Sequence, residues 1–518
     1  MSLGKIIWVD DEIESLTSQQ LFLQAKGYEI ETFSNGFDAL ESLPSIQPDI
    51  VLLDESMPGI SGLETLSKIK ESYHNLPVVL ITKNETENLM DDAIGSQIAD
   101  YLIKPVNPNQ VLLSLKKLLE NKRLVAEKTT SAYQQQFGQL FSALSGSLDY
   151  KEWIDLYKKL EYWELEMEKS DSPEMMEVFQ TQKQEANTEF YKYIYRNYAD
   201  WLYAKDDDAP IMSHTLLKNK LFPLLNKEIP TFFILIDNLR FDQWKTIQPM
   251  FTDLFRIEEE DCFYATLPTA TQYSRNAIFA GMLPLEIQKK YPDKWKNDDD
   301  DGSKNLHEAF FLENYLKKNG HGDLKFSYTK VLNHQEGQEM NNNFLNLLSN
   351  DLNVIVYNFV DMLSHARTEM EVLKELASDE KGYRSLTKSW FSNSPLRQAL
   401  LKLEGKKVNI VVATDHGSVR VRTPYKVVGD KQTTANLRYK HGRNLNYNPK
   451  EVFAFKNPAE AGLPSPTINS SFIFAKEDGF LCYPNNYNYY ASYYKDSFQH
   501  GGVSLEEMII PVITLKSK

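Results

Sequence analysis

The stretch DIVLLDESMPG at residues 49–59 reads as a buried strand followed at once by acidic and turn-forming residues. Similar short apolar runs, separated by amphipathic stretches, recur from the N-terminus to about residue 122. Strands that alternate with helices predict a parallel sheet covered on both faces. We therefore expect a doubly wound α/β domain over residues 1–122. Its strand runs are IIWVD, YEIETF, DIVLLD, VVLIT and ADYLI.

Acidic residues follow the first and third of these runs. Asp10 and Asp11 end the first run, and Asp54 ends the third. An aspartate that accepts a phosphoryl group requires a divalent cation, because carboxylate and phosphoryl oxygens repel each other. Hard oxygen ligands suit Mg²⁺. We therefore expect a magnesium site made by Asp10, Asp11, Asp54 and the backbone carbonyl of Ser56.

Three further residues complete a pattern with these acids. Thr82 closes the fourth run, Tyr101 lies in the fifth, and Lys104 follows it, where its charge can stabilise phosphoryl oxygens. In this order and spacing the segment resembles the receiver domain of two-component response regulators. The resemblance implies that a sensor histidine kinase phosphorylates Asp54, and that Thr82 and Tyr101 respond to the phosphoryl group.

Residues 123–205 show helical periodicity only. Apolar and aromatic residues recur three and four positions apart, as in Tyr133, Phe137, Leu140, Phe141 and Leu144. This spacing predicts a bundle of about three helices, with the aromatic stripes packed in its core rather than exposed to a ligand.

Buried-strand runs return after about residue 226, and several of them end in an acid. They are TFFILID, NVIVYNFVD, VNIVVATD and MIIPVITL, with shorter runs VFAF and FIF between the last two. In open α/β sheets, ligands bind outside the carboxyl ends of the strands. We therefore expect a second α/β domain over residues 206–518, with its site at these strand ends.

Three aspartates, three histidines and one hydroxyl lie at or near those ends. Asp361 and His365 are four residues apart and can share one side of a helical turn. A mixed nitrogen and oxygen set without thiolate suits Zn²⁺, with Mn²⁺ as second choice. Six ligands exceed what one catalytic zinc needs, so we expect two ions about 3.5–4 Å apart. The full set is Asp237, Thr271, Asp361, His365, Asp415, His416 and His500.

The order of these residues, with PTAT followed by SRNAIF and G, resembles the PglZ-type branch of the alkaline phosphatase superfamily. The resemblance implies that Thr271 attacks phosphorus, and that the substrate is a phosphodiester of nucleotide type. It implies one metal held by Asp237, Asp415 and His416 together with Thr271. It implies a second metal held by Asp361, His365 and His500.

The sequence leaves the roles of several other polar residues open. Thr269 is an alternative nucleophile, although related diesterases use the second threonine of a P-T-x-T motif. Arg275, Asn276 and His441 could contact the substrate, and for each of them an ordinary structural role is the alternative. The same applies to Asp242, Lys440 and Arg443.

Composition limits the partners. The formal net charge of −15 disfavours duplex DNA binding. The two cysteines, Cys262 and Cys482, form no disulfide framework, which favours a reducing compartment. We see no signal peptide or run long enough for membrane insertion, so we expect a cytoplasmic protein.

Together, the fold class is α/β, with a doubly wound receiver domain, an α-helical bundle linker and a large α/β alkaline phosphatase-like domain. This order resembles response regulators associated with type IX secretion. The resemblance implies a homodimer on phosphorylation, zinc binding and cleavage of linear or cyclic oligonucleotides. The alternative is an interaction protein with a structural metal domain, which binds a transcription factor or a secretion-system component.

Overall fold

The computed structural model divides into two compact units, residues 1–134 with 169–172 and residues 135–168 with 173–518. The boundary expected at residue 122 lies inside a continuous helix, α6 (Asn121–Leu144), and the one expected at residue 205 lies outside the described residues. The described residues are 3–73, 76–83, 98–144, 146–170, 173–204, 209–298, 300–377, 379–429, 434–465 and 469–518.

The N-terminal unit contains the parallel five-stranded sheet that the sequence predicts, in the order β2-β1-β3-β4-β5. Its first strand shows why both faces are covered. Ile6 and Trp8 pack with α1 and α5, whereas Ile7 and Val9 pack with α2 and α3. The strands are β1 (Lys5–Val9), β2 (Glu29–Phe33), β3 (Ile50–Asp54), β4 (Val78–Thr82) and β5 (Asp100–Ile103). The helices are η1 (Ile13–Leu16), α1 (Thr17–Ala25), α2 (Gly36–Ile46), α3 (Gly62–Ser72), α5 (Pro108–Leu115) and η2 (Lys116–Glu120).

The helical segment contains α6, α7 (Tyr150–Ser170) and α8 (Pro173–Trp201), which matches the expected three helices. Most of the predicted stripe is core, since Tyr133, Leu140 and Leu144 are buried. Phe141 departs from the prediction. Its side chain is exposed and stacks with that of Phe137 one turn away, because a helix that packs along a narrow stripe leaves the flanking positions in solvent.

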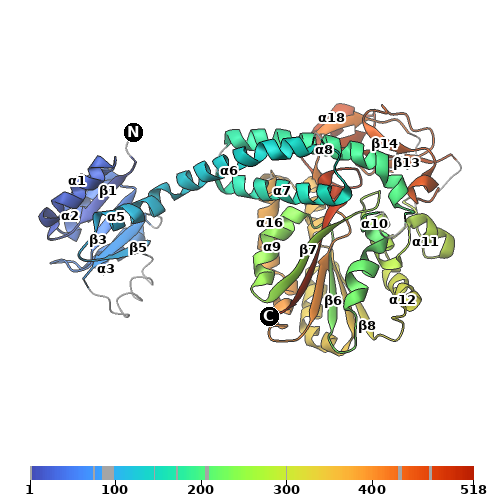
Figure 1. Ribbon diagram of the computed structural model, residues 1–518, viewed down its shortest axis with the longest axis horizontal. Coiled ribbons are helices and arrows are strands. Elements are labelled where there is room, and N and C mark those ends of the chain that lie inside the picture. Colours follow the sequence, from blue (N-terminus) through green and yellow to red (C-terminus); the bar gives the residue numbers. More distant parts are fainter. Residues whose placement is uncertain are drawn as a thin grey trace. The chain divides into compact units, whose positions relative to one another are not determined.

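The large domain is built on a six-stranded sheet in the order β7-β18-β10-β6-β9-β8 (Figure 1). The strands β8, β9, β6 and β10 are parallel, and β18 is antiparallel to both of its neighbours. All residues of β6, β9 and β10 are buried, as expected for continuous apolar runs between two layers of helices. The strands are β6 (Thr231–Ile236), β7 (Phe255–Tyr264), β8 (Phe326–Val331), β9 (Leu352–Tyr357), β10 (Asn409–Ala413) and β18 (Ile509–Ser517).

Helices cover both faces of this sheet. Successive residues of β6 point in opposite directions, so Phe233 packs against Phe279 of α10 while Phe232 stacks on Phe344. In Figure 1, α9 (Phe241–Thr252) and α16 (Glu380–Asn393) lie to one side of the sheet, and α10 (Thr271–Ala280) and α12 (Glu308–Lys318) lie to the other.

The runs VFAF and FIF lie outside the main sheet. They form β14 (Val452–Phe455) and β15 (Ser471–Ala475), which pair with β13 (Tyr439–Gly442) in a separate three-stranded sheet. Two small ladders pair β11 (Val419–Arg420) with β17 (Phe498–Gln499), and β12 (Thr423–Lys426) with β16 (Gly479–Cys482). The remaining α-helices are α11 (Pro284–Lys290), α13 (His334–Asn342), α14 (Phe359–Glu369), α15 (Glu371–Leu376), α17 (Pro395–Leu401), α18 (Tyr487–Tyr494) and α19 (Leu505–Met508). The short helical turns are η3 (Ser213–Thr215), η4 (Leu217–Leu221), η5 (Phe222–Leu224), η6 (Phe344–Ser349) and η7 (Pro458–Ala461).

Among the described residues, no helix combines the length and the apolar character needed to cross a bilayer.

Candidate active site

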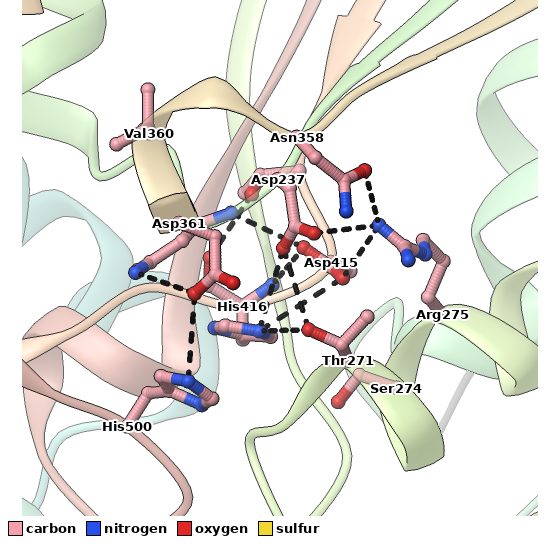
Figure 2. Close-up of polar contacts among 12 residues, drawn as sticks. Asp237, Thr271, Ser274, Arg275, Asn358, Val360, Asp361, Asp415, His416 and His500 are labelled. Atoms are coloured by element: carbon pink, nitrogen blue, oxygen red, sulfur yellow. Dashed lines mark hydrogen bonds and ion pairs between the residues drawn. The ribbon is translucent and has the colours of Figure 1, made fainter. Parts of the chain in front are cut away.

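The seven residues expected to form the site lie together at one edge of the large sheet. Figure 2 shows Asp237, Thr271, Asp361, Asp415, His416 and His500 there. Asp237 directly follows β6, and Asp415 follows β10 by two residues. Thr271 is the first residue of α10, and His500 directly follows β17. Because parallel strands place their carboxyl ends at the same edge, segments distant in the chain converge there.

The first group of ligand atoms comes from Asp237, Asp415 and His416. These atoms lie within 4.8 Å of one another, and all three side chains are buried. The hydroxyl of Thr271 lies 3.0 Å from Nε2 of His416 and donates to Oδ1 of Asp237 at 3.5 Å. A cation held by this group would therefore lie beside the hydroxyl oxygen.

The second group comes from Asp361, His365 and His500, again within 4.8 Å. Nε2 of His500 lies 3.6 Å from Oδ1 of Asp361, and Nε2 of His365 lies 3.6 Å from Oδ2 of the same carboxylate. The side chain of His365 is 62% exposed, so this group is open to solvent on its side. The two groups adjoin, because the rings of His416 and His500 stack with centroids 4.2 Å apart.

Backbone carbonyls orient two of the histidines. Nδ1 of His416 lies 3.1 Å from the carbonyl oxygen of Gly417, and Nδ1 of His500 lies 3.2 Å from that of Thr269. A carbonyl accepts but cannot donate, so each Nδ1 carries the proton and Nε2 keeps its lone pair for the site.

The residues fit a pair of divalent cations. Oδ2 of Asp415 is buried and accepts no hydrogen bond from the described residues. Burial and the neighbouring charge of Asp237 raise the pKa of Asp415, and burial with the same charge raises the pKa of Asp361 to about 6. Burial and the neighbouring His416 and His365 lower the pKa of His500. Clustered carboxylates and imidazoles are a donor set that a divalent ion stabilises.

Thr269 contacts the loop that carries His500. Its hydroxyl donates to the carbonyl of Gly502 at 2.9 Å and accepts from the backbone N–H of Gly501 at 3.0 Å. The side chain is fully buried. Both hydrogen-bonding roles of the hydroxyl are thus used within the protein, whereas the hydroxyl of Thr271 faces the ligand groups.

Arg275 contacts the first group of ligands through Asp237, and its other contact is with the buried Glu308. Its Nη1 pairs with Oδ2 of Asp237 at 2.7 Å, and its Nε donates to Oε1 of Glu308 at 2.6 Å. Burial alone would raise the pKa of Asp237, but the guanidinium of Arg275 and the imidazole of His416 lower it below its ordinary value. Arg275 therefore holds Asp237 in its charged form and orients its second oxygen.

Asn276 and His441 also contact protein groups. Nδ2 of Asn276 donates to the carbonyls of Gln272 and Lys304. Nε2 of His441 lies 2.9 Å from Oδ2 of Asp298. Both side chains are buried.

Asn238 and Glu308 also belong to the site, although the sequence patterns did not predict them. The amide of Asn238 donates to Oδ1 of Asp361 at 3.4 Å, and its backbone N–H donates to Oδ1 of Asp415 at 3.3 Å. It therefore connects the two groups. Asn238 has φ 61°, in the left-handed region where asparagine is enriched. An asparagine directly after a strand-end aspartate was the available signal, whereas nothing local marks Glu308.

In the receiver unit, ligand atoms of Asp10, Asp11 and Asp54 lie within 4.8 Å of one another. Nζ of Lys104 lies 2.9 Å from Asp10 and 3.0 Å from Asp54. Burial raises the pKa of Asp54, partly offset by Lys104.

The other receiver residues flank this acidic group. Thr82 is buried at the end of β4, Tyr101 is 41% exposed on β5, and Ser56 is exposed two residues after β3.

Three family models match the chain in the expected order. Residues 6–116 match the response regulator receiver domain, and residues 123–202 match the PorX response regulator linker domain. Residues 216–515 match the BREX system PglZ alkaline phosphatase-like domain. The last match covers more than half of the chain.

Individual curated relatives match a smaller part of this chain. The transcriptional regulatory protein ZraR of Klebsiella oxytoca is 34% identical over 26% of this chain and 30% of its own length. The alkaline phosphatase synthesis transcriptional regulatory protein PhoP of Bacillus subtilis is 28% identical over 26% of this chain and 57% of its own length. The chain thus spans less than two thirds of these relatives.

Among solved structures, the chemotaxis protein CheY4 of Vibrio cholerae is 27% identical, with a TM-score of 0.22, over 22% of this chain and 98% of its own. A CheY-like receiver domain protein of Methanospirillum hungatei is 26% identical, with a TM-score of 0.22, over 23% of this chain and 96% of its own. With receiver, linker and PglZ domains in this order, the chain is a PorX-like response regulator, and most of its length belongs to the PglZ alkaline phosphatase-like family.

Proposed function

We propose that this response regulator is a two-metal phosphodiesterase whose receiver domain is phosphorylated on Asp54. The observation that carries the proposal is the position of the Thr271 hydroxyl, 3.0 Å from His416 and beside two adjoining groups of metal-type ligands. Zn²⁺ is the preferred ion and Mn²⁺ the second choice, because the donors are carboxylates and imidazoles without thiolate. Mg²⁺ suits the oxygen ligands of the receiver site.

The proposed reaction begins with Thr271. Its Oγ1 attacks the phosphorus of a phosphodiester and one alcohol leaves, so that threonine is joined to the phosphoryl group that still carries the second alcohol. Water then hydrolyses the threonine–phosphorus linkage and releases a phosphomonoester. Two bound cations would lower the pKa of the attacking hydroxyl and stabilise the attacking and leaving oxygens. The chain's own residues prepare this step, since Asp237 and His416 hold the hydroxyl in place and Arg275 keeps Asp237 ionised.

The substrate class is a nucleotide or oligonucleotide phosphodiester, linear or cyclic. This choice follows the resemblance to diesterases that use a threonine nucleophile. A hydrolase of the alkaline phosphatase superfamily needs an open face for such a substrate, and the exposed side of His365 supplies one.

The test uses three full-length proteins. Thr271→Ala should reduce hydrolysis of a chromogenic phosphodiester by at least about a thousandfold, the cost of losing a nucleophile. Metal content, measured by mass spectrometry of the purified protein, should remain at two ions. Thr181→Ala, an exposed threonine on α8, is the matched control and should keep full activity. Undiminished turnover by the Thr271→Ala protein would exclude this nucleophile.

A second function rests on the receiver site, because receivers commonly act by exposing a partner surface. A sensor histidine kinase would phosphorylate Asp54 in the cytoplasm and favour a homodimer. The dimer would bind a transcription factor or a component of type IX secretion, with the metal domain structural. Normal signalling in a Thr271→Ala strain would favour this function. An unchanged oligomeric mass after addition of a phosphoryl mimic would exclude phosphorylation-dependent dimerisation.

A further inference from the structure

A cavity of about 570 Å³ lies between β13, β16 and α18. Its volume is within the range of small-molecule sites. Its polar and aromatic lining consists mainly of tyrosine rings and one lysine side chain. The lining includes Lys440, Cys482, Tyr483, Tyr490 and Tyr494.

Lys440 is a buried amine that forms no ion pair with a carboxylate of the described residues. Its Nζ donates to the carbonyl of Thr434 at 2.9 Å and lies 4.3 Å from the ring centroid of Tyr483. No carboxylate of the described residues lies within ion-pair distance of it, although its side chain is fully buried. Burying an ammonium without a counter-ion is costly, and burial lowers the pKa of Lys440 to about 7. An anion in the cavity would supply the missing partner.

Aromatic side chains form the rest of the wall. Tyr490 and Tyr494 lie one turn apart on α18, with centroids 6.1 Å apart and planes 15° apart. Tyr490 is 40% exposed. Nearly parallel rings at the edge of a cavity offer a surface on which a flat heterocycle can stack.

The cavity is separate from the metal centre. Side chains alternate along β13, so Tyr439 and His441 face one way and Lys440 faces the other. The hydroxyl of Tyr439 donates to Asp298, which also accepts from Tyr273, two residues after Thr271. The face of β13 opposite Lys440 is thus the one that contacts α10. Lys440, one of the possible substrate contacts in the sequence, therefore lies on the face of β13 opposite His441.

We propose that this cavity is a second nucleotide-binding site, in which the tyrosines of α18 stack on the base and Lys440 pairs with the phosphate. A nucleotide has both a flat base, which can stack on the tyrosine rings, and an anionic phosphate, which can pair with Lys440. The inference does not depend on catalysis at the metal centre. A nucleotide bound in the cavity would nevertheless affect the metal centre through β13. The ring of Tyr439, on this strand, packs closely against Gly501, which is next to His500.

The test is calorimetric titration of the full-length protein with guanosine 5′-monophosphate. Lys440→Met keeps the shape of the side chain and removes the charge, and Tyr490→Ala removes one ring. Each should weaken binding at least tenfold. Lys426→Met, at an exposed position of the neighbouring strand β12, should bind the nucleotide as the native protein does.

Asp361→Asn separates this site from the metal centre. It should impair hydrolysis of the chromogenic diester while binding of guanosine 5′-monophosphate persists. Loss of binding in Asp361→Asn, with native affinity in Lys440→Met and Tyr490→Ala, would place the nucleotide at the metal centre and overturn the proposal. The absence of binding by the native protein at millimolar ligand would overturn it as well.

Discussion

The guanidinium of Arg275 lies 2.7 Å from Oδ2 of Asp237, and the same side chain pairs with Glu308 at 2.6 Å. All three side chains are at most 2% exposed. The arginine therefore belongs to a buried charge network that extends to Lys330, 3.2 Å from Glu308. Its guanidinium therefore contacts protein carboxylates, and we propose that it orients the metal ligand Asp237 rather than binding substrate.

We expect Arg275→Met to lower the free energy of unfolding by about 3–5 kcal/mol, since it leaves two buried carboxylates without their shared partner. Urea denaturation of the purified protein measures this loss. Arg256→Met is the control, because Arg256 is exposed and pairs with Glu258 at the surface. Equal urea midpoints for the two variants would show that the buried charge network does not stabilise the fold.

We expect Thr269→Val to reduce phosphodiesterase activity roughly 10–100-fold, the usual effect of removing a group that orients a metal ligand. The substitution removes both hydrogen bonds to the Gly501–Gly502 loop but leaves the Thr271 hydroxyl in place. Steady-state kinetics and metal titration measure the effect. A loss as complete as that of Thr271→Ala, with metal affinity intact, would instead identify Thr269 as the nucleophile.

We expect Asp54→Asn to abolish phosphorylation by a small phosphodonor such as acetyl phosphate. The carboxylate of Asp54 is buried beside Asp10 and Lys104, and asparagine cannot accept the phosphoryl group. Mass spectrometry of the intact protein detects the modification. Asp38→Asn, at an exposed position of α2, should be phosphorylated normally. Persistent modification of the Asp54→Asn protein would point to another acceptor.

Stability should depend on pH through Lys440. Burial lowers its pKa in the folded protein to about 7, from an ordinary value of 10.5. Between these values the unfolded chain binds a proton that the folded chain does not, so this group's contribution to stability rises with pH. The free energy of unfolding of the native protein, minus that of Lys440→Met, should therefore increase by up to about 1.4 kcal/mol per pH unit above pH 7.

Urea denaturation at pH 7, 8 and 9 provides the measurement. A difference between the two proteins that stays constant over this range would show that Lys440 remains charged when buried.

Much of the architecture could be predicted from local patterns. The apolar runs that became β1, β3, β6, β9 and β10 are continuous, and this pattern depends only on neighbouring residues. The run NVIVYNFVD departs from the prediction, because β9 ends at Tyr357 and Asp361 lies in α14. Position at or near a strand end also indicated the three aspartates and three histidines that the structure brings together in two groups. Phe141 shows the limit of periodicity, because spacing identifies a helical face but not how much of that face a partner covers.

The sequence by itself determined the order of the three domains and the set of side chains to which we assign the chemistry. Only the tertiary structure decided what each polar group contacts: Thr269 binds the His500 loop, Arg275 binds Asp237 and Glu308, and Lys440 turns away from the metal centre. The reason is that local structure depends on residues a few positions apart. The partner of a buried charge, in contrast, comes from a distant segment that only the packing of helices on the sheet brings within reach.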